Sequence, residues 1–216
     1  MTAAPVVGVL ALQGDFEAHA RVLRALGAEV REVRVPADLE GLDGLVMPGG
    51  ESTTMTLGIE REGLAEPLRA FGKPIFGTCA GLIMLDRAHL GLMDITAVRN
   101  AFGRQLHSFE EDLPFPGIEG GPVRAVFIRA PWIASHGPDV EVLAAVDGHP
   151  VAARQGNLLA ISFHPELGDD DRLHRAFLEQ VRAARNGRYG ARWPCAVGRE
   201  VGCHVPGSRT HGQRYA

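Results

Sequence analysis

The sequence predicts an α/β fold, a three-layer sandwich with a mostly parallel central sheet. Three observations predict it. Apolar runs typical of strands alternate with segments of helical spacing between residues 6 and 85. The first run, residues 6–12, is continuously apolar, as in a parallel strand that is buried on both faces. Polar or glycine-rich turns follow several of the strands, and ligands bind at that edge of such sheets.

The composition is that of an ordinary globular protein. The chain has 216 residues, of which 45% are hydrophobic and 22% charged, enough for one good core. A net charge of −4 argues against a nucleic-acid partner. No apolar run approaches the roughly 20 residues that span a bilayer, so no membrane segment is predicted. Residues 1–5 lack the charged start of a signal peptide, and a cytoplasmic location is expected.

The first strand, at residues 6–12, leads into a helix. Apolar side chains recur at helical spacing from Phe16 to Leu26, and Gly27 is suited to end that helix. The turn between them, Gln13–Asp15, is expected at the carboxyl end of the strand.

Two further strands are predicted at residues 29–35 and 44–47. The second ends in Pro48–Thr54, where Gly49 and Gly50 allow backbone N–H groups to approach a ligand. An ordinary βα loop with a capping residue explains the same pattern. A phosphate loop does not, because no Gly-Lys-Ser/Thr follows.

The next helix is predicted over residues 55–71. Ser52 or Thr53 is expected to cap it. Gly63 and Pro67 are candidate breaks, because glycine and proline both interrupt helices.

Residues 75–85 predict a nucleophile elbow. A short apolar strand leads to Cys79, Gly77 and Gly81 flank it, and an apolar helix follows. Small neighbours are needed where a strained nucleophile turn brings strand and helix close together. A helix N-terminus also favours the thiolate. A buried structural cysteine is the alternative, since free cysteine is often buried.

The middle of the chain is less regular. Residues 99–105 are polar and loop-like, residues 106–109 suit a short strand, and residues 114–122 form a connecting loop rich in Pro and Gly. A strand is predicted at residues 123–128, before Arg129-Ala130-Pro131.

A hairpin, a strand and a helix complete the fold. Residues 140–146 and 151–154 flank an Asp-Gly turn, which is a hairpin signal. The strand at residues 157–163 ends in His164-Pro165-Glu166, and a helix is predicted over residues 169–185.

The sequence divides into a domain over residues 1–185 and a flexible C-terminal tail over residues 186–216. The tail is rich in Gly and Arg and has no periodicity. Two of the three cysteines, Cys195 and Cys203, lie there near histidines, but their spacing fits no compact zinc knuckle. An odd cysteine count implies no disulfide framework, and no metal or cofactor is predicted.

Cys79 needs a base to hold its thiolate, and His164 is the best placed of the nine histidines. His164 directly follows a buried-type strand. Glu166, two residues on, could orient the imidazole, which makes a Cys-His-Glu triad. An exposed turn before a helix explains His164–Glu166 equally well by itself. The triad is favoured because the elbow, the Gly-Gly loop and this motif all follow predicted strands.

These motifs resemble the class I, triad-type glutamine amidotransferases, whose fold is flavodoxin-like. The residues concerned are Gly77–Gly81, Pro48–Ser52 and His164–Glu166. More specific segments resemble the glutaminase subunits of pyridoxal 5′-phosphate synthases, and the similarity runs from about residue 7 to residue 185. Those segments are Leu12–Asp15, Gly50–Thr54, Arg99–Gln105 and Phe127–Pro131.

The resemblance implies hydrolysis of L-glutamine, with Cys79 as nucleophile, His164 as proton carrier and Glu166 as its orienting group. It implies an oxyanion hole from the backbone N–H groups of Gly50 and Ala80. An arginine suits the α-carboxylate of glutamine, which it can bind with two hydrogen bonds. The residues that match glutamine-holding positions are Gly49, Gly50, Glu51, Arg99, Ile128 and Arg129.

The resemblance also implies a partner. Ammonia is expected to pass to a barrel-shaped synthase subunit, which joins it to a pentose phosphate and a triose phosphate within a large ring complex. The glutaminase is expected to be weakly active until docked, and Gln13 is a candidate for coupling docking to the oxyanion hole. The segment between Leu85 and Leu92 is shorter than expected for the family, with no loss of catalysis anticipated.

Three other functions remain open on the residues. A glutaminase subunit for imidazole glycerol phosphate synthesis would share the elbow and His164–Glu166, but fits residues 99–105 and 128–131 less well. A cysteine peptidase or γ-glutamyl hydrolase could use the same fold. A catalytically dead binding module is disfavoured, because Cys79, His164 and Glu166 are all present.

Overall fold

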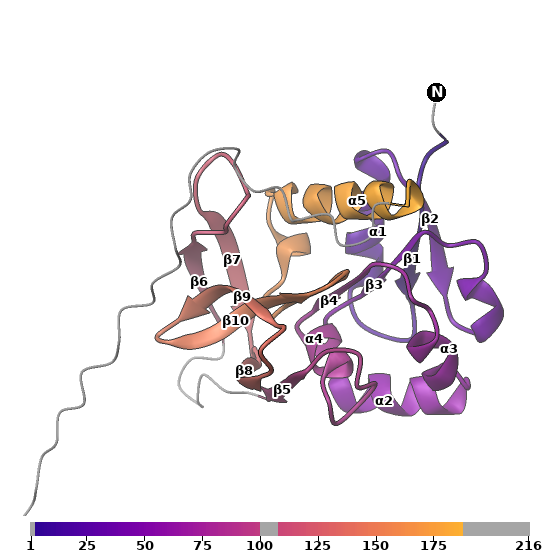
Figure 1. The fold of residues 1–216 in the computed structure, drawn as a ribbon, viewed down its shortest axis with the longest axis horizontal. Coiled ribbons are helices and arrows are strands. Elements are labelled where there is room, and N and C mark those ends of the chain that lie inside the picture. Colours follow the sequence, from indigo (N-terminus) through magenta and orange to yellow (C-terminus); the bar gives the residue numbers. More distant parts are fainter. Residues whose placement is uncertain (1–2, 100–107, 188–216) are drawn as a thin grey trace, which may run out of the picture.

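A seven-stranded sheet forms the middle layer of the protein. The computed structural model describes residues 3–99 and 108–187 (Figure 1). In spatial order the strands are β2 (Glu29–Val33), β1 (Val6–Leu10), β3 (Gly44–Met47), β4 (Ile75–Thr78), β11 (Leu158–Ile161), β10 (His149–Gln155) and β9 (Glu141–Val146). The first five are parallel, and β10 and β9 continue the sheet antiparallel. This order is the doubly wound, flavodoxin-like one, which confirms the predicted fold class.

Helices cover both faces of this sheet (Figure 1). On one face lie α1 (Phe16–Ala25) and α5 (Arg172–Arg185), and on the other lie α2 (Ser52–Arg61), α3 (Ala65–Arg69) and α4 (Ala80–Leu85). Each helical layer closes its own hydrophobic cluster against the sheet. Short 3₁₀ turns, η1 (Pro36–Leu39) and η2 (Pro165–Leu167), lie in the connections. Within residues 3–99 and 108–187, no helix combines the length and the apolar character needed to cross a membrane.

Two antiparallel ribbons extend the fold beside the sheet. One pairs β5 (Ile95–Val98) with β8 (Trp132–His136), and the other pairs β6 (Ser108–Leu113) with β7 (Val123–Ile128). The predicted hairpin is β9–β10. Its turn residues Asp147 and Gly148 have φ of 49° and 78°, the positive values that a tight two-residue hairpin turn requires.

The α2–α3 region corrects two sequence predictions. The cap of α2 is Glu51 rather than Ser52 or Thr53, because the longer side chain folds back and accepts the N–H groups of Thr53 and Thr54 at 3.2 and 2.7 Å. The break between α2 and α3 occurs at Gly63, as expected, with φ of 67°. The break expected at Pro67 was wrong. Pro67 lies in the first turn of α3, where a missing N–H breaks no helical hydrogen bond.

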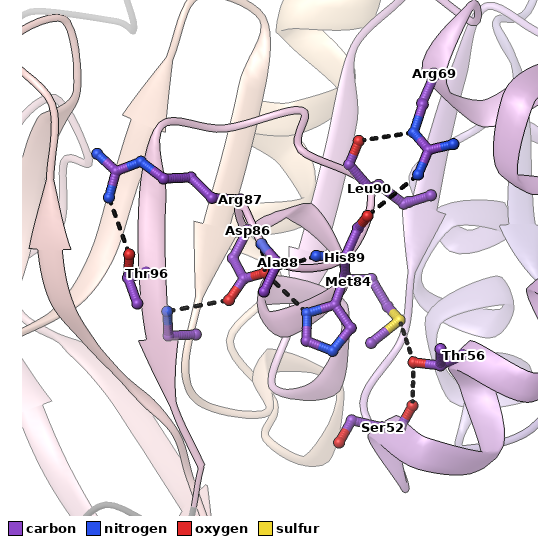
Figure 2. Close-up of polar contacts among 11 residues, drawn as sticks. Ser52, Thr56, Arg69, Met84, Asp86, Arg87, Ala88, His89, Leu90 and Thr96 are labelled. Atoms are coloured by element: carbon purple, nitrogen blue, oxygen red, sulfur yellow. Dashed lines mark hydrogen bonds and ion pairs between the residues drawn. The ribbon is translucent and has the colours of Figure 1, made fainter.

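Asp86 closes the connection between α4 and β5 (Figure 2). Only 2% of it is exposed, and Oδ1 accepts the backbone N–H groups of Ala88 and His89 at 2.8 and 3.1 Å. Oδ1 also lies 2.8 Å from His89 Nδ1, and Oδ2 accepts the N–H of Ala97 at 3.2 Å. One carboxylate therefore ties this short loop to β5, directly after the helix that begins at the nucleophile elbow.

The end of α5 at Arg185 agrees with the predicted helix end. The division into a domain over residues 1–185 and a tail over residues 186–216 stays a prediction. Residues 188–216, with Cys195 and Cys203, lie outside the described residues. In the described ranges, no group of three or more His, Cys, Asp or Glu side chains is arranged to hold a metal ion.

Candidate active site

A cleft of about 390 Å³ opens where β3, β4 and β11 end. Its wall contains every residue that the sequence singled out for a site: Gly49, Gly50, Glu51, Cys79, Ala80, Arg99, Ile128, Arg129, His164 and Glu166. Residues from distant parts of the chain meet here because parallel strands deliver their carboxyl ends to one edge of the sheet.

Cys79 is held in a strained turn between β4 and α4. Its φ and ψ are 49° and −104°, a conformation that L-residues rarely adopt. Its backbone N–H donates to the carbonyl of Ile161 in the neighbouring strand at 2.8 Å, which fixes the turn. A Cβ on Gly77 would lie 2.8 Å from the backbone of Gly81, and a Cβ on Gly81 would lie 2.0 Å from Met47 O. Glycine is therefore required on both sides of the nucleophile turn, as the sequence predicted.

His164 faces the same gap as Cys79. A Cβ on Gly49 would lie 2.4 Å from His164 Cε1 and 3.3 Å from Cys79 Cβ, so both side chains pack against this glycine. Burial acts to lower the pKa of His164, but its hydrogen bonds to Cys79 and Glu166 outweigh burial and raise the pKa to about 10. A protonated imidazole beside a thiol stabilises the thiolate, which is the reactive form.

Glu166 lies in η2 with 2% of its surface exposed, and its Oε1 is 2.7 Å from His164 Nδ1. Burial acts to raise the pKa of this carboxyl. Its contact with the His19 imidazole and its hydrogen bond with His164 outweigh burial, so the pKa lies below its usual value. An ionised Glu166 accepts the Nδ1–H of His164 and thereby leaves Nε2 as the nitrogen that can exchange a proton.

Glu51 and Arg99 form the outer wall of the cleft. Arg99 Nη2 lies 2.9 Å from Glu51 Oε1, and Arg99 Nη1 donates to Thr53 Oγ1 at 3.2 Å. The backbone N–H groups of Thr54 and Thr53 lower the pKa of Glu51 to about 2. Arg129, across the cleft, has φ of 45°, so its backbone is strained as well. The rest of the predicted segment 99–105 lies outside the described residues.

The turn after β1 packs directly on the glycine loop after β3. Gln13 Oε1 accepts the N–H of Glu51 at 2.8 Å. Gly14 has φ of 85°, and a Cβ there would lie 1.9 Å from Gly49 O. The turns that carry Gln13, Gly49 and Cys79 therefore lie together at the carboxyl edge of the sheet.

The comparison with known proteins agrees with this arrangement. The SNO glutamine amidotransferase family matches residues 9–183, which is most of the chain. The chain belongs to this family. The predicted resemblance to glutamine amidotransferases is thereby confirmed.

This SNO glutamine amidotransferase has close relatives. It is 53% identical to the pyridoxal 5′-phosphate synthase subunit PdxT of Frankia alni over 196 residues, covering 85% of this chain and 98% of the relative. It is 56% identical to PdxT of Geobacillus kaustophilus over 189 residues, covering 83% and 96%. A crystal structure of a glutamine amidotransferase superposes with a TM-score of 0.77 at 48% identity, covering 82% of this chain and 98% of that one.

Two buried histidines lie behind His164 and Glu166, and the sequence patterns did not predict them. His19 in α1 and His174 in α5 are both fully buried. Sequence signals existed, because His19 stands on the apolar face of its helix, four residues before the core residue Leu23. A histidine at a core position needs polar partners, and that requirement could have directed attention to Glu166.

Proposed function

We propose that this enzyme hydrolyses L-glutamine to L-glutamate and ammonia with Cys79, His164 and Glu166 as its triad. One observation carries the proposal. A histidine paired with a buried carboxylate at 2.7 Å packs with the elbow cysteine against the same glycine, at the ends of two neighbouring strands. Membership of a glutamine amidotransferase family supports the choice of an amide substrate.

The geometry supports a two-stage reaction. The Cys79 thiolate attacks the side-chain amide carbon of glutamine, and the carbonyl electrons move to oxygen. As the C–N bond breaks, protonated His164 gives its proton to the leaving nitrogen and ammonia departs. A γ-glutamyl thioester remains on Cys79. Neutral His164 then takes a proton from water, the hydroxide displaces the sulfur, and glutamate is released.

Backbone N–H groups are suited to hold the developing oxyanion. Ala80 is the first residue of α4, and N–H groups in a first helical turn have no acceptor within the helix. Gly50, on the facing loop with φ of 133°, is the second proposed donor. Gly49, Glu51 and Ile128 shape the remaining walls of the cleft around the substrate.

An arginine is the proposed partner of the substrate α-carboxylate. Arg99 and Arg129 both line the cleft. Arg99 is already paired with Glu51, which fixes its position at the mouth. A guanidinium can donate two parallel hydrogen bonds to a carboxylate, and that selects an amino acid over a simple amide.

The ammonia is proposed to serve pyridoxal 5′-phosphate synthesis. The relatives from Frankia alni and Geobacillus kaustophilus are subunits of pyridoxal 5′-phosphate synthase. The chain would therefore dock on a barrel-shaped synthase subunit within a ring complex and act in the cytoplasm. Gln13, which binds the backbone beside Gly50, is the proposed link between docking and the oxyanion hole.

The deciding experiment measures glutamate release from glutamine, with and without the synthase partner of the same organism. Amide-labelled glutamine follows the nitrogen into pyridoxal 5′-phosphate. Cys79→Ser is expected to abolish both signals, and full hydrolysis by this variant would refute the triad. Transfer to a histidine-pathway barrel instead, or cleavage of peptides or folyl-polyglutamates, would assign one of the rival functions.

A glutamine-mimicking alkylator gives a second test. Cys79 should react before Cys195 and Cys203 in the assembled complex, because Cys79 lines the proposed glutamine site. Equal labelling of all three thiols would contradict the proposed site.

A further inference from the structure

Behind Glu166, a chain of buried polar contacts continues away from the cleft. His19 Nε2 lies 3.3 Å from Glu166 Oε2 and 3.2 Å from Thr78 Oγ1. On its other side, His19 Nδ1 lies 2.9 Å from His174 Nε2. His19, Thr78 and His174 are all fully buried, so no solvent competes for these contacts.

We propose that His19 is a positioning residue for Glu166, and that His174 in turn fixes the tautomer of His19. The triad is then anchored by two helices, α1 and α5, that contribute no group to the cleft itself. This inference rests on the proposed function, because it assigns a role to residues behind the same triad.

One arrangement of protons is compatible with the contacts between His164, Glu166, His19 and His174. His164 Nδ1–H donates to Glu166 Oε1, so Oε2 is left for His19. If His19 carries its proton on Nε2, that N–H donates to Thr78 Oγ1 and lies beside Glu166 Oε2, a buried oxygen with no hydrogen-bond partner among the described residues, and its bare Nδ1 accepts the N–H of His174 Nε2. The other tautomer would aim a nitrogen lone pair at the carboxylate from 3.3 Å, which is repulsive.

His174, the residue farthest from Glu166 in this row of contacts, is consistent with that arrangement of protons. Among the described residues, His174 Nδ1 has no hydrogen-bond partner, as suits the unprotonated nitrogen of a neutral imidazole. Burial lowers the pKa of both histidines, to about 3 for His174, so both are neutral at physiological pH. His174 donates to His19, and the N–H of His19 then points toward the carboxylate of Glu166. Because both imidazoles are neutral, this arrangement adds no buried charge.

The packing leaves the rings little freedom. The two imidazole centroids are 5.1 Å apart, and Phe76 meets His174 edge-on at 5.7 Å and His19 at 6.5 Å. Phe76 itself is fully buried in the sheet beneath α5. The position of Glu166 is thereby set by the packing of the core.

The charged and titratable groups around Glu166 come from several elements. They are His164 and Cys79 on the cleft side, His19 with Asp15 from α1 and its cap, and His174 from α5. Of these, only His19 approaches the second carboxylate oxygen. Glu166 Oε2 has no hydrogen-bond partner among the described residues, so removing His19 takes away the one polar group that stabilises its negative charge, which favours protonation of the carboxylate.

The test compares His19→Leu with His19→Gln, each in the full chain with its synthase partner. The side-chain amide of Gln can present an N–H near the position of Nε2, and Leu cannot. His19→Leu is expected to lower kcat about tenfold with little change in KM, and to move the acid limb of the kcat/KM profile about one pH unit upward. His19→Gln is expected to recover most of both changes.

A readout independent of turnover accompanies these assays. In a Cys195→Ser, Cys203→Ser background, the iodoacetamide reaction of Cys79 reports the thiolate fraction against pH. Its midpoint should rise in His19→Leu, because a protonated Glu166 supports the imidazolium of His164 less. Leu23→Ala in the same helix is the packing control. It should lower Tm without moving either pH profile.

The outcomes separate the two proposals. Wild-type kcat and pH profile in His19→Leu, or equal losses in the Leu and Gln variants, would overturn the positioning role and leave the triad intact. Activity in Cys79→Ser would overturn the triad first. If His19→Leu fails to fold, His174→Leu gives the decision. It should shift the same pH profiles in the same direction by a smaller amount. Unchanged profiles would overturn the proposed roles of His19 and His174.

Discussion

Replacing Gly81 with alanine tests whether close contact between α4 and β3 holds the nucleophile in place. A Cβ at this position would lie 2.0 Å from Met47 O, 2.9 Å from Met47 C and 3.1 Å from Met47 Cβ. The first two atoms belong to the backbone of a central strand and cannot rotate away. The helix must therefore move outward, and Cys79, at its N-terminus, must move with it.

The expected loss follows from the nature of this clash. Overpacking a core with one carbon costs about 1–3 kcal/mol, and a backbone obstacle places Gly81→Ala at the upper end or beyond. For a chain of this size, about 3 kcal/mol lowers Tm by roughly 6–12 °C. A shift of around 1 Å at a reacting group can lower the rate about 100-fold, so kcat should fall far more than stability alone explains.

The assay pairs thermal unfolding with glutamine hydrolysis in the presence of the synthase partner. Gly58→Ala is the matched control, because Gly58 is also helical and the three atoms nearest to its added Cβ all belong to the side chain of Leu12, at 3.2 Å or more. Gly58→Ala should keep Tm within about 3 °C and retain activity, because alanine favours the helix. Equal Tm and equal kcat for the two variants would refute the argument from backbone contact.

Three further perturbations have defined outcomes. Asp86→Ala should lower the free energy of unfolding by roughly 2–4 kcal/mol in urea titrations, because the N–H groups of Ala88, His89 and Ala97 lose their acceptor. Asp94→Asn, in a partly exposed ion pair with Arg87, should change it by less than about 1 kcal/mol, and equal losses would contradict this. His164 has a folded pKa of about 10 against 6.5, so its stabilisation is complete below pH 6.5 and is lost as the pH rises towards 10. His164→Asn should flatten that loss in urea titrations between these pH values, and an unchanged slope would contradict it. Gln13→Ala should reduce partner-stimulated hydrolysis, and unchanged stimulation would exclude the proposed coupling.

Much of the fold could be predicted from local sequence pattern. The apolar run at residues 6–12 and the Gly-flanked Cys79 specify a buried strand and an elbow, because each depends on burial or on backbone sterics near one position. The hairpin turn at Asp147 and Gly148 is likewise a local choice. Such features depend on few long-range contacts, so the sequence determines them directly.

The two wrong predictions, the cap of α2 and the break at Pro67, both depend on where a helix begins. The cap of α2 is Glu51 because its side chain turns back over two N–H groups, and the simple preference for serine or threonine does not capture that reach. Pro67 is tolerated because it falls in a first helical turn, a position that depends on where Gly63 ends the preceding helix. The location of a helix boundary decided both cases.

The buried histidines needed tertiary information of another kind. His19 and His174 lie on helices far apart in sequence, and only the packing of α1 beside α5 brings them to 2.9 Å. Nothing in either helix alone specifies the other as a partner. The position of His19 on the apolar face of α1 indicated that it is buried. The carboxylate that His19 approaches, Glu166, comes from the turn after β11.

The insertion of β11 beside β4 also decides when, during synthesis, the enzyme can become active. Cys79 leaves the ribosome early, whereas His164, Glu166 and the strand whose Ile161 carbonyl holds the elbow emerge late. A nascent chain that ends within the β9–β10 hairpin has the thiol but no imidazole beside it. With the proposed triad, glutamine hydrolysis therefore requires that all seven strands of the sheet have been synthesised.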